Sequence, residues 1–93
     1  MKKYEIVLSF IALNGIEKLK KSGDKNALRK LKALLDELED HPFIGTGKPE
    51  QLKDNRTAQW SRRINQKHRL VYEVDNDKIK VLVISTYGHY DDK

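Results

Sequence analysis

Three groups of side chains in the second half of the chain have the residue types that acid–base and phosphate chemistry requires. Glu50 stands between Lys48 and Lys53. A carboxylate so placed is either half of a surface ion pair or a base that neighbouring cations keep ionised. His89 and Tyr90 follow a strand-like run. A histidine there can donate a proton near neutral pH and a tyrosine can stack on a base, although a frayed terminus has the same composition.

The third group consists of arginines on two expected strands. Adjacent strand residues face opposite sides, so Arg62 shares the side of Trp60 while Arg63 lies on the other. Arg69 opens the next strand and can approach Arg63 across the ladder. Two arginines on one sheet face would form a clamp for phosphate, because guanidinium binds phosphate oxygens in a bidentate way. The alternative is that each arginine pairs with a carboxylate of a helix, and both interpretations are open.

These groups together are the side chains that cleavage of RNA requires. A base must take the proton of the 2′-hydroxyl, an acid must protonate the leaving 5′-oxygen, and cations must stabilise the charge that builds on the phosphate. Glu50, His89 and the arginines would supply them. We expect no metal and no cofactor, because the nucleophile belongs to the substrate. His41 and His68 are interpreted as structural, since three scattered histidines lack metal-ligand spacing.

The size and charge of the chain limit the classes of protein to which it can belong. The 93 residues predict a single domain, residues 1–93, with 35% charged residues and a net charge of +5. Segment 48–69 carries seven basic and two acidic residues and so accounts for the whole excess. This focus indicates either a polyanionic partner, nucleic acid before membrane, or a solvated basic loop. The absence of cysteine excludes disulfides and thiolate sites. With no spanning segment or signal peptide expected, we expect a cytoplasmic protein.

The elements that must position these side chains are predicted from periodicity. Residues 4–8 are expected to form a strand, and Ser9 is expected to cap a helix that ends at Ser22 and Gly23. Gly15 is unfavourable inside that helix. A second helix is expected to begin after Asp24 and to stop before the His-Pro pair at 41–42. Its packing stripe consists of Ala27, Leu28, Leu31, Leu34, Leu35 and Leu38.

The remainder of the chain is rich in β-forming residues. Residues 44–50 are expected to form a loop, whose two glycines lack the ending of a phosphate-binding P-loop. Strands are expected over 59–64, 69–74 and 79–86, with a hairpin turn at 75–77. This order predicts an α+β fold, an antiparallel sheet with two N-terminal helices packed on one face.

The motifs of the second half resemble one toxin family. They run in a specific order and spacing through about residues 42–90: Gly47-Lys48-Pro49-Glu50-Gln51-Leu52-Lys53, Trp60-Ser61-Arg62-Arg63-Ile64, His68-Arg69-Leu70-Val71-Tyr72 and Gly88-His89-Tyr90. The chain is similar to the Txe/YoeB toxins of the RelE/ParE toxin–antitoxin superfamily. The first 41 residues match only in layout.

The resemblance implies a microbial-RNase-like fold and a ribosome-dependent endonuclease that cuts mRNA in the A site and so inhibits translation. By this resemblance Glu50 is the general base, His89 the general acid, and Arg69 the residue that stabilises the phosphate. Lys48, Lys53 and Arg63 would contact the RNA, as would Tyr90, which would stack on a base and help to place it for catalysis.

The resemblance also implies partners. These are a YefM-type antitoxin encoded alongside, the ribosome and its mRNA, operator DNA only through the antitoxin complex, and a homodimer in some relatives. Three departures from the family pattern are Gln51, Ala58 and the added Asp91-Asp92-Lys93. Gln51 and the acidic tail motivate an alternative, a degenerate toxin that binds the antitoxin or the ribosome without catalysis. A gyrase-inhibiting toxin of the ParE branch is a weaker alternative, because it has no use for the Lys-Pro-Glu and His-Tyr motifs.

Overall fold

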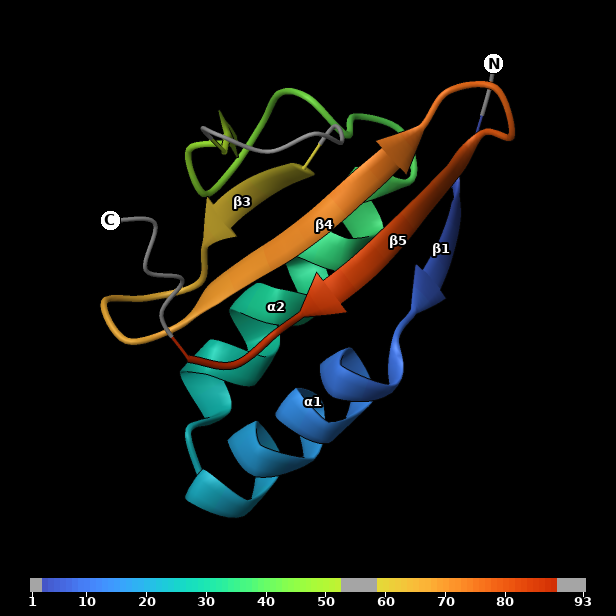
Figure 1. The fold of residues 1–93 in the computed structure, drawn as a ribbon. Helices are drawn as coiled ribbons and strands as arrows, with labels where there is room; N and C mark the ends of the chain where they lie inside the picture. Colours follow the sequence, from blue (N-terminus) through green and yellow to red (C-terminus); the bar gives the residue numbers. More distant parts are fainter. Residues whose placement is uncertain (1–2, 53–58, 89–93) are drawn as a thin grey trace.

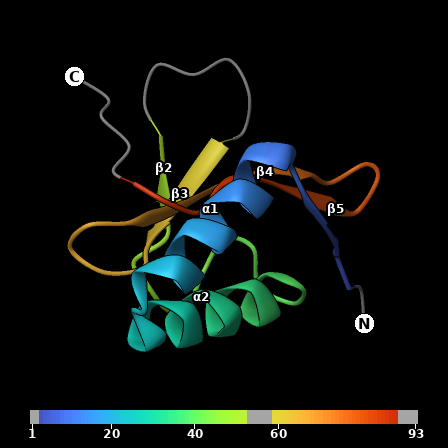
Figure 2. The same cartoon turned by 90° about the horizontal axis from the view of Figure 1, so that it is seen from below.

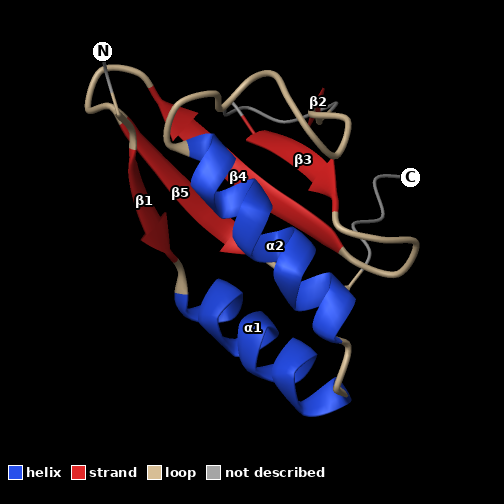
Figure 3. Ribbon diagram, turned by 180° about the vertical axis from the view of Figure 1, so that it is seen from behind, coloured by secondary structure: helices blue, strands red, loops and turns tan. Residues whose placement is uncertain are grey.

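The fold places the two expected helices beside a five-stranded sheet. The computed structural model describes residues 3–52 and 59–88. Along this part of the chain the elements are β1 (Glu5–Leu8), α1 (Phe10–Ser22), α2 (Lys25–Leu38), β2 (Glu50–Gln51), β3 (Gln59–Arg63), β4 (Arg69–Asp75) and β5 (Lys80–Ser85). Helix α2 lies across one face of the sheet, and α1 lies beside α2 near the end of β5 (Figures 1 and 3). The α+β class with both helices on one side is therefore confirmed.

The sheet is mixed, and in this respect the expectation of an antiparallel sheet was wrong. Its strand order is β1-β5-β4-β3-β2, and every neighbouring pair is antiparallel except β1 with β5. These two run parallel, with Glu5 opposite Lys80 and Leu8 opposite Val83. The sequence shows where strands lie but not their partners. Between β1 and β5 the chain passes through both helices and then through β2, β3 and β4, so β5 returns to lie alongside β1 in the same direction.

Both helices begin at the predicted caps. The Ser9 hydroxyl accepts a hydrogen bond from the N–H of Ala12 at 3.0 Å, and the Asp24 carboxylate accepts one from Ala27 at 3.0 Å. Each cap satisfies an N–H that the first turn leaves without a partner. Helix α1 ends at Ser22, and the Gly23 that caps it has a left-handed φ of 76°. Helix α2 ends at Leu38, a few residues before the proline that was expected to stop it.

The leucine stripe of α2 forms much of the core, as predicted. Ala27, Leu31, Leu34 and Leu38 are buried, and they pack with the inward residues of the central strands, Leu70, Tyr72, Val74, Val81 and Val83. Gly15 is explained by the same packing. A Cβ at this position would come within 2.4 Å of the Thr86 Oγ1 and 2.9 Å of the Tyr87 Cβ. The Thr86 hydroxyl donates to the Ala12 carbonyl at 2.7 Å, which draws α1 onto the end of β5.

Among the described residues, no helix lies over the opposite face of the sheet (Figure 2). The predicted hairpin turn is present between β4 and β5, where the Asp75 carboxylate accepts hydrogen bonds from the N–H groups of Asp77 and Lys78. Two-residue strand β2 was expected to be loop, and it joins the sheet edge beside β3. Within residues 3–52 and 59–88, no helix is long and apolar enough to span a membrane.

Candidate active site

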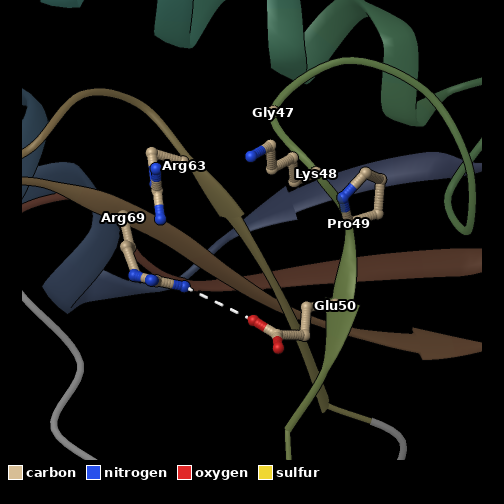
Figure 4. Close-up of a pocket in the computed structure, with 6 residues that line it drawn as sticks. All are labelled: Gly47, Lys48, Pro49, Glu50, Arg63 and Arg69. Carbon is tan, nitrogen blue, oxygen red and sulfur yellow. Dashed lines mark ion pairs between the residues drawn. The ribbon is translucent and has the colours of Figure 1, made fainter.

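Strand register brings Glu50, Arg63 and Arg69 together on the open face. Arg63 lies directly opposite Arg69 in the β3–β4 ladder, and Glu50 of β2 lies opposite Ser61 of β3. An Nη1 of Arg69 approaches the Glu50 carboxylate at 3.8 Å and donates to the Ser61 hydroxyl at 3.3 Å. Figure 4 shows these side chains converging. The predicted approach of Arg63 and Arg69 across the ladder is confirmed.

A hollow of about 330 Å³ lies among these groups. It is lined by Gly47, Lys48, Pro49, Glu50, Arg63 and Arg69. Three cationic side chains therefore surround one carboxylate. The Glu50 side chain is 69% exposed and that of Arg69 22% exposed, so the carboxylate is open to solvent while its arginine is held against the sheet. Such a hollow can bind an anion and accept a proton next to it.

The loop before β2 carries Lys48 into this hollow through an unusual backbone. Lys48 has a φ of 52°, the left-handed region that non-glycine residues rarely adopt. Gly47 before it has a φ of 83°, and a Cβ there would lie 3.0 Å from the Arg63 carbonyl oxygen. The Arg63 N–H donates to the Gly47 carbonyl at 2.7 Å. Gly47 thus allows a close backbone approach to β3.

Arg62 points the other way, into the core, so the arginines do not all have the same role. It is fully buried and pairs with Glu37 of α2. Its remaining N–H groups donate to the Tyr72 hydroxyl and to three carbonyls of the loop, at His41, Ile44 and Thr46. The helix-carboxylate interpretation therefore holds for Arg62, whereas Arg63 and Arg69 lie opposite each other on the open face of the sheet.

The Arg62–Glu37 pair also holds the loop that precedes Glu50. The Glu37 carboxylate accepts from the N–H of Thr46 at 2.7 Å and from its hydroxyl at 3.0 Å. Burial alone would raise the pKa of Glu37, but the Thr46 hydrogen bonds and the Arg62 guanidinium lower it below its usual value. For Tyr72, burial raises the pKa despite its contact with Arg62. Sequence reasoning missed this network, although the Arg-Arg pair on one strand already implied one inward guanidinium.

The end of the described chain lies next to Arg69. The Gly88 N–H donates to Nδ1 of His68 at 2.9 Å, and the N–H of Arg69 donates to the Gly88 carbonyl at 2.9 Å. The Tyr87 ring packs on His68 with centroids 4.4 Å apart. The structural interpretation of His68 is thus confirmed, and its partner is the segment that leads to the His-Tyr motif. Lys53, His89 and Tyr90 themselves lie outside the described residues, as do Ala58 and residues 91–93.

Comparison with known proteins shows the family to which this chain belongs. The profile of the YoeB-like toxins of bacterial type II toxin–antitoxin systems matches residues 15–90. The chain belongs to this family. The Toxin YoeB of Synechocystis is 47% identical over 68 residues, which cover 72% of this chain and 76% of that protein. The predicted family is confirmed, and the match extends beyond the motifs into both helices.

Solved structures agree with this assignment. A Staphylococcus aureus YoeB dimer superposes with a TM-score of 0.80 at 36% identity, and covers 95% of this chain and 99% of that one. A heterotetrameric YoeB–YefM toxin–antitoxin complex from the same organism gives a TM-score of 0.75 at 36% identity, with the same coverage. The fold and the class, a YoeB-like toxin of a type II system, are therefore established for this chain.

Proposed function

We propose that this YoeB-like toxin is a ribosome-dependent endoribonuclease that cuts mRNA in the A site and so inhibits translation. The observation that carries the proposal is the meeting of Glu50 with Lys48, Arg63 and Arg69 around one open hollow. A base beside three cations suits attack by a 2′-hydroxyl on the adjacent phosphodiester. The cations neutralise charge that grows in the transition state, and the base accepts the proton of the nucleophile.

In this mechanism each side chain has a separate task. Glu50 takes the proton of the 2′-hydroxyl, and Arg69 stabilises the phosphate as its charge grows. Lys48, Lys53 and Arg63 orient the RNA backbone. His89 protonates the leaving 5′-oxygen, and Tyr90 stacks on a base to place it. The hydrogen bonds that join Gly88 to His68 and Arg69 support a role for the two residues that follow in the sequence.

The partners we propose follow from the relatives. Structures of the Staphylococcus aureus toxin are known both as a dimer and in complex with YefM, so we propose a YefM-type antitoxin for this chain and a capacity to dimerise. The complex with the antitoxin would be the form that reaches operator DNA. A ribosomal substrate places the activity in the cytoplasm. Residues 1–93 would act as one toxin domain, without metal or cofactor.

The test compares two carboxylates of similar exposure. Glu50 and Glu5 are 69% and 66% exposed, and each lies within 4 Å of a cation, Arg69 at 3.8 Å and Lys80 at 3.9 Å. Wild-type protein added to translating ribosomes should give A-site cuts by primer extension. Glu50→Gln should slow cutting by about 10²–10⁴-fold, and Glu5→Gln should leave it unchanged.

Three results would contradict the proposal. Intact mRNA with wild-type protein would favour the degenerate, non-catalytic toxin, especially if the protein still bound ribosomes. Equal slowing by both substitutions would mean that Glu50 has no special role. Inhibition of gyrase-driven relaxation of a plasmid, with mRNA intact, would favour the ParE-like alternative.

A further inference from the structure

A second hollow adjoins the proposed active site on the side toward α2. It has a volume of about 430 Å³ and shares Gly47, Lys48 and Arg63 with the first. Its other walls come from Lys30 of α2 and from Ile64, Asn65 and Gln66, which follow β3. The two hollows are therefore adjacent, and Lys48 and Arg63 belong to the walls of both.

The cationic side chains of this hollow lack the carboxylate partners that Arg62 and Arg69 have. Within residues 3–52 and 59–88, neither Lys30 nor Lys48 nor Arg63 forms an ion pair with a carboxylate, and no acidic residue lines the second hollow. By contrast, Arg62 pairs with Glu37, and Arg69 approaches Glu50. Three neighbouring cations without counter-charges repel one another, and a bound anion relieves that repulsion.

The non-cationic walls have a different chemistry and a fixed shape. The lining of this hollow is mostly apolar, and Ile64, which is 4% exposed, forms part of its floor. The Asn65 carboxamide oxygen accepts hydrogen bonds from the N–H groups of Lys67 and His68, each at 2.8 Å, which fixes the turn. Because that oxygen is engaged, the amide group of Asn65 retains its N–H donors. The apolar lining suits the flat face of a base, and the Asn65 amide suits the hydrogen-bonding edge of that base. The cations suit the phosphate of the same nucleotide.

We propose that the second hollow is a subsite for the nucleotide next to the scissile one, with its base against Ile64 and its phosphate held by Lys30. The proposal deepens the proposed function and rests on it for the identity of the RNA. Lys30 is the residue that distinguishes the two hollows, since it lines the second and not the first. It lies in the helical half of the chain, outside the motifs that carry the toxin resemblance.

The test measures RNA binding without cleavage. The probes are single-stranded oligoribonucleotides that carry 2′-O-methyl groups, so no nucleophile is present, and empty ribosomes form a second arm. Lys30→Ala is compared with Lys32→Ala, a substitution of the same charge on the same helix at an exposed position outside both hollows. Circular dichroism checks that both variants keep the fold. Lys30→Gln repeats the test with a neutral side chain that is longer than that of alanine.

Loss of one phosphate contact should weaken oligonucleotide binding about fivefold at 0.1 M salt. It should also lower the slope of log K against log salt by about 0.7. Lys32→Ala should leave both quantities unchanged. A purely structural effect of Lys30→Ala would not change the slope. In cleavage assays Lys30→Ala should raise KM and leave kcat near the wild-type value, because the chemical groups are untouched.

An effect of Lys30→Ala on the oligonucleotides would support the subsite on the mRNA strand. An effect on empty ribosomes alone would place Lys30 against ribosomal RNA and would overturn the subsite. Equal effects of Lys30→Ala and Lys32→Ala, or an effect only on antitoxin binding, would overturn the subsite. If wild-type protein cut no mRNA but the Lys30 effect on RNA binding persisted, the proposed function would fail while the subsite remained.

Discussion

At the scale of single residues, the adjacent arginines of β3 show how the pleat of a strand separates two tasks. Arg62 is fully buried and uses its guanidinium on Glu37, Tyr72 and loop carbonyls. Arg63 is exposed on the opposite face, where it lines both hollows. The same side chain therefore stabilises the protein at one position and is available to ligand at the next.

Substitution of the two arginines by methionine should separate these tasks. Arg62→Met should lower the free energy of unfolding by about 3–5 kcal/mol, because it leaves a partly buried Glu37 charge and several buried acceptors without a partner. Arg63→Met should change the free energy of unfolding by less than about 0.5 kcal/mol and should still impair cleavage. Urea denaturation measures the first effect. Equal destabilisation by the two substitutions would contradict the assignment.

Glu37 gives this stabilisation a pH dependence whose direction is fixed. The pKa of Glu37 in the folded protein lies below its ordinary value of 4.5, so its contribution is complete above that value and is lost as the pH falls through the lower folded pKa. Wild-type stability should therefore fall below about pH 4.5 more steeply than that of Glu37→Gln, which has no carboxylate to titrate. Thermal midpoints measured from pH 3 to pH 7 check this. Parallel profiles would count against it.

At the scale of secondary-structure elements, the close packing of α1 against β5 depends on one glycine. Gly15→Ala would ordinarily favour a helix by about 1 kcal/mol. Here the new Cβ would meet Thr86 and Tyr87, so we expect net destabilisation of about 1–3 kcal/mol. Asn14→Ala on the same helix is the control, because Asn14 is exposed and the substitution gains helix propensity without a contact. Stabilisation by Gly15→Ala in urea denaturation would refute the close approach.

The elements themselves could largely be predicted from the sequence, whereas their pairing could not. Caps such as Ser9 and Asp24 and the leucine stripe of α2 act locally, so local patterns predict them. The parallel partner of β1 and the two-residue strand β2 depend on contacts between distant segments. In the site, alternation predicted that Arg63 would face Arg69, but the Glu50–Arg69 approach required the β2–β3 register. Lys30 was missed because in sequence it is one lysine among several on α2.

At the scale of the whole molecule, β4 is the centre around which the other layers assemble. It pairs with β3 on one side and β5 on the other, and its inward residues Leu70, Tyr72 and Val74 belong to the core. Strands β1 and β2 form the two edges. Protection of the backbone should therefore decrease from the centre of the sheet outward.

Native-state hydrogen exchange should show this gradient. Amides of Leu70, Tyr72 and Val74 should exchange slowest, because they open only with global unfolding, and those of β2 should exchange fastest among the strands. Two-dimensional NMR after transfer into D2O resolves the individual amides. Protection of β2 equal to that of β4 would contradict the proposed centre.

The parallel pairing of β1 with β5 also has a consequence during synthesis. Glu5 pairs with Lys80, which is added to the chain 75 positions later, so β1 cannot pair with β5 before then. At 5–20 residues per second that interval is about 4–15 s. Until then the first strand has no neighbour in the sheet, and the hollow beside Arg69 lacks the segment that ends at Gly88. The partly made chain therefore cannot have the finished fold. It cannot present a complete site to the ribosome that is making it.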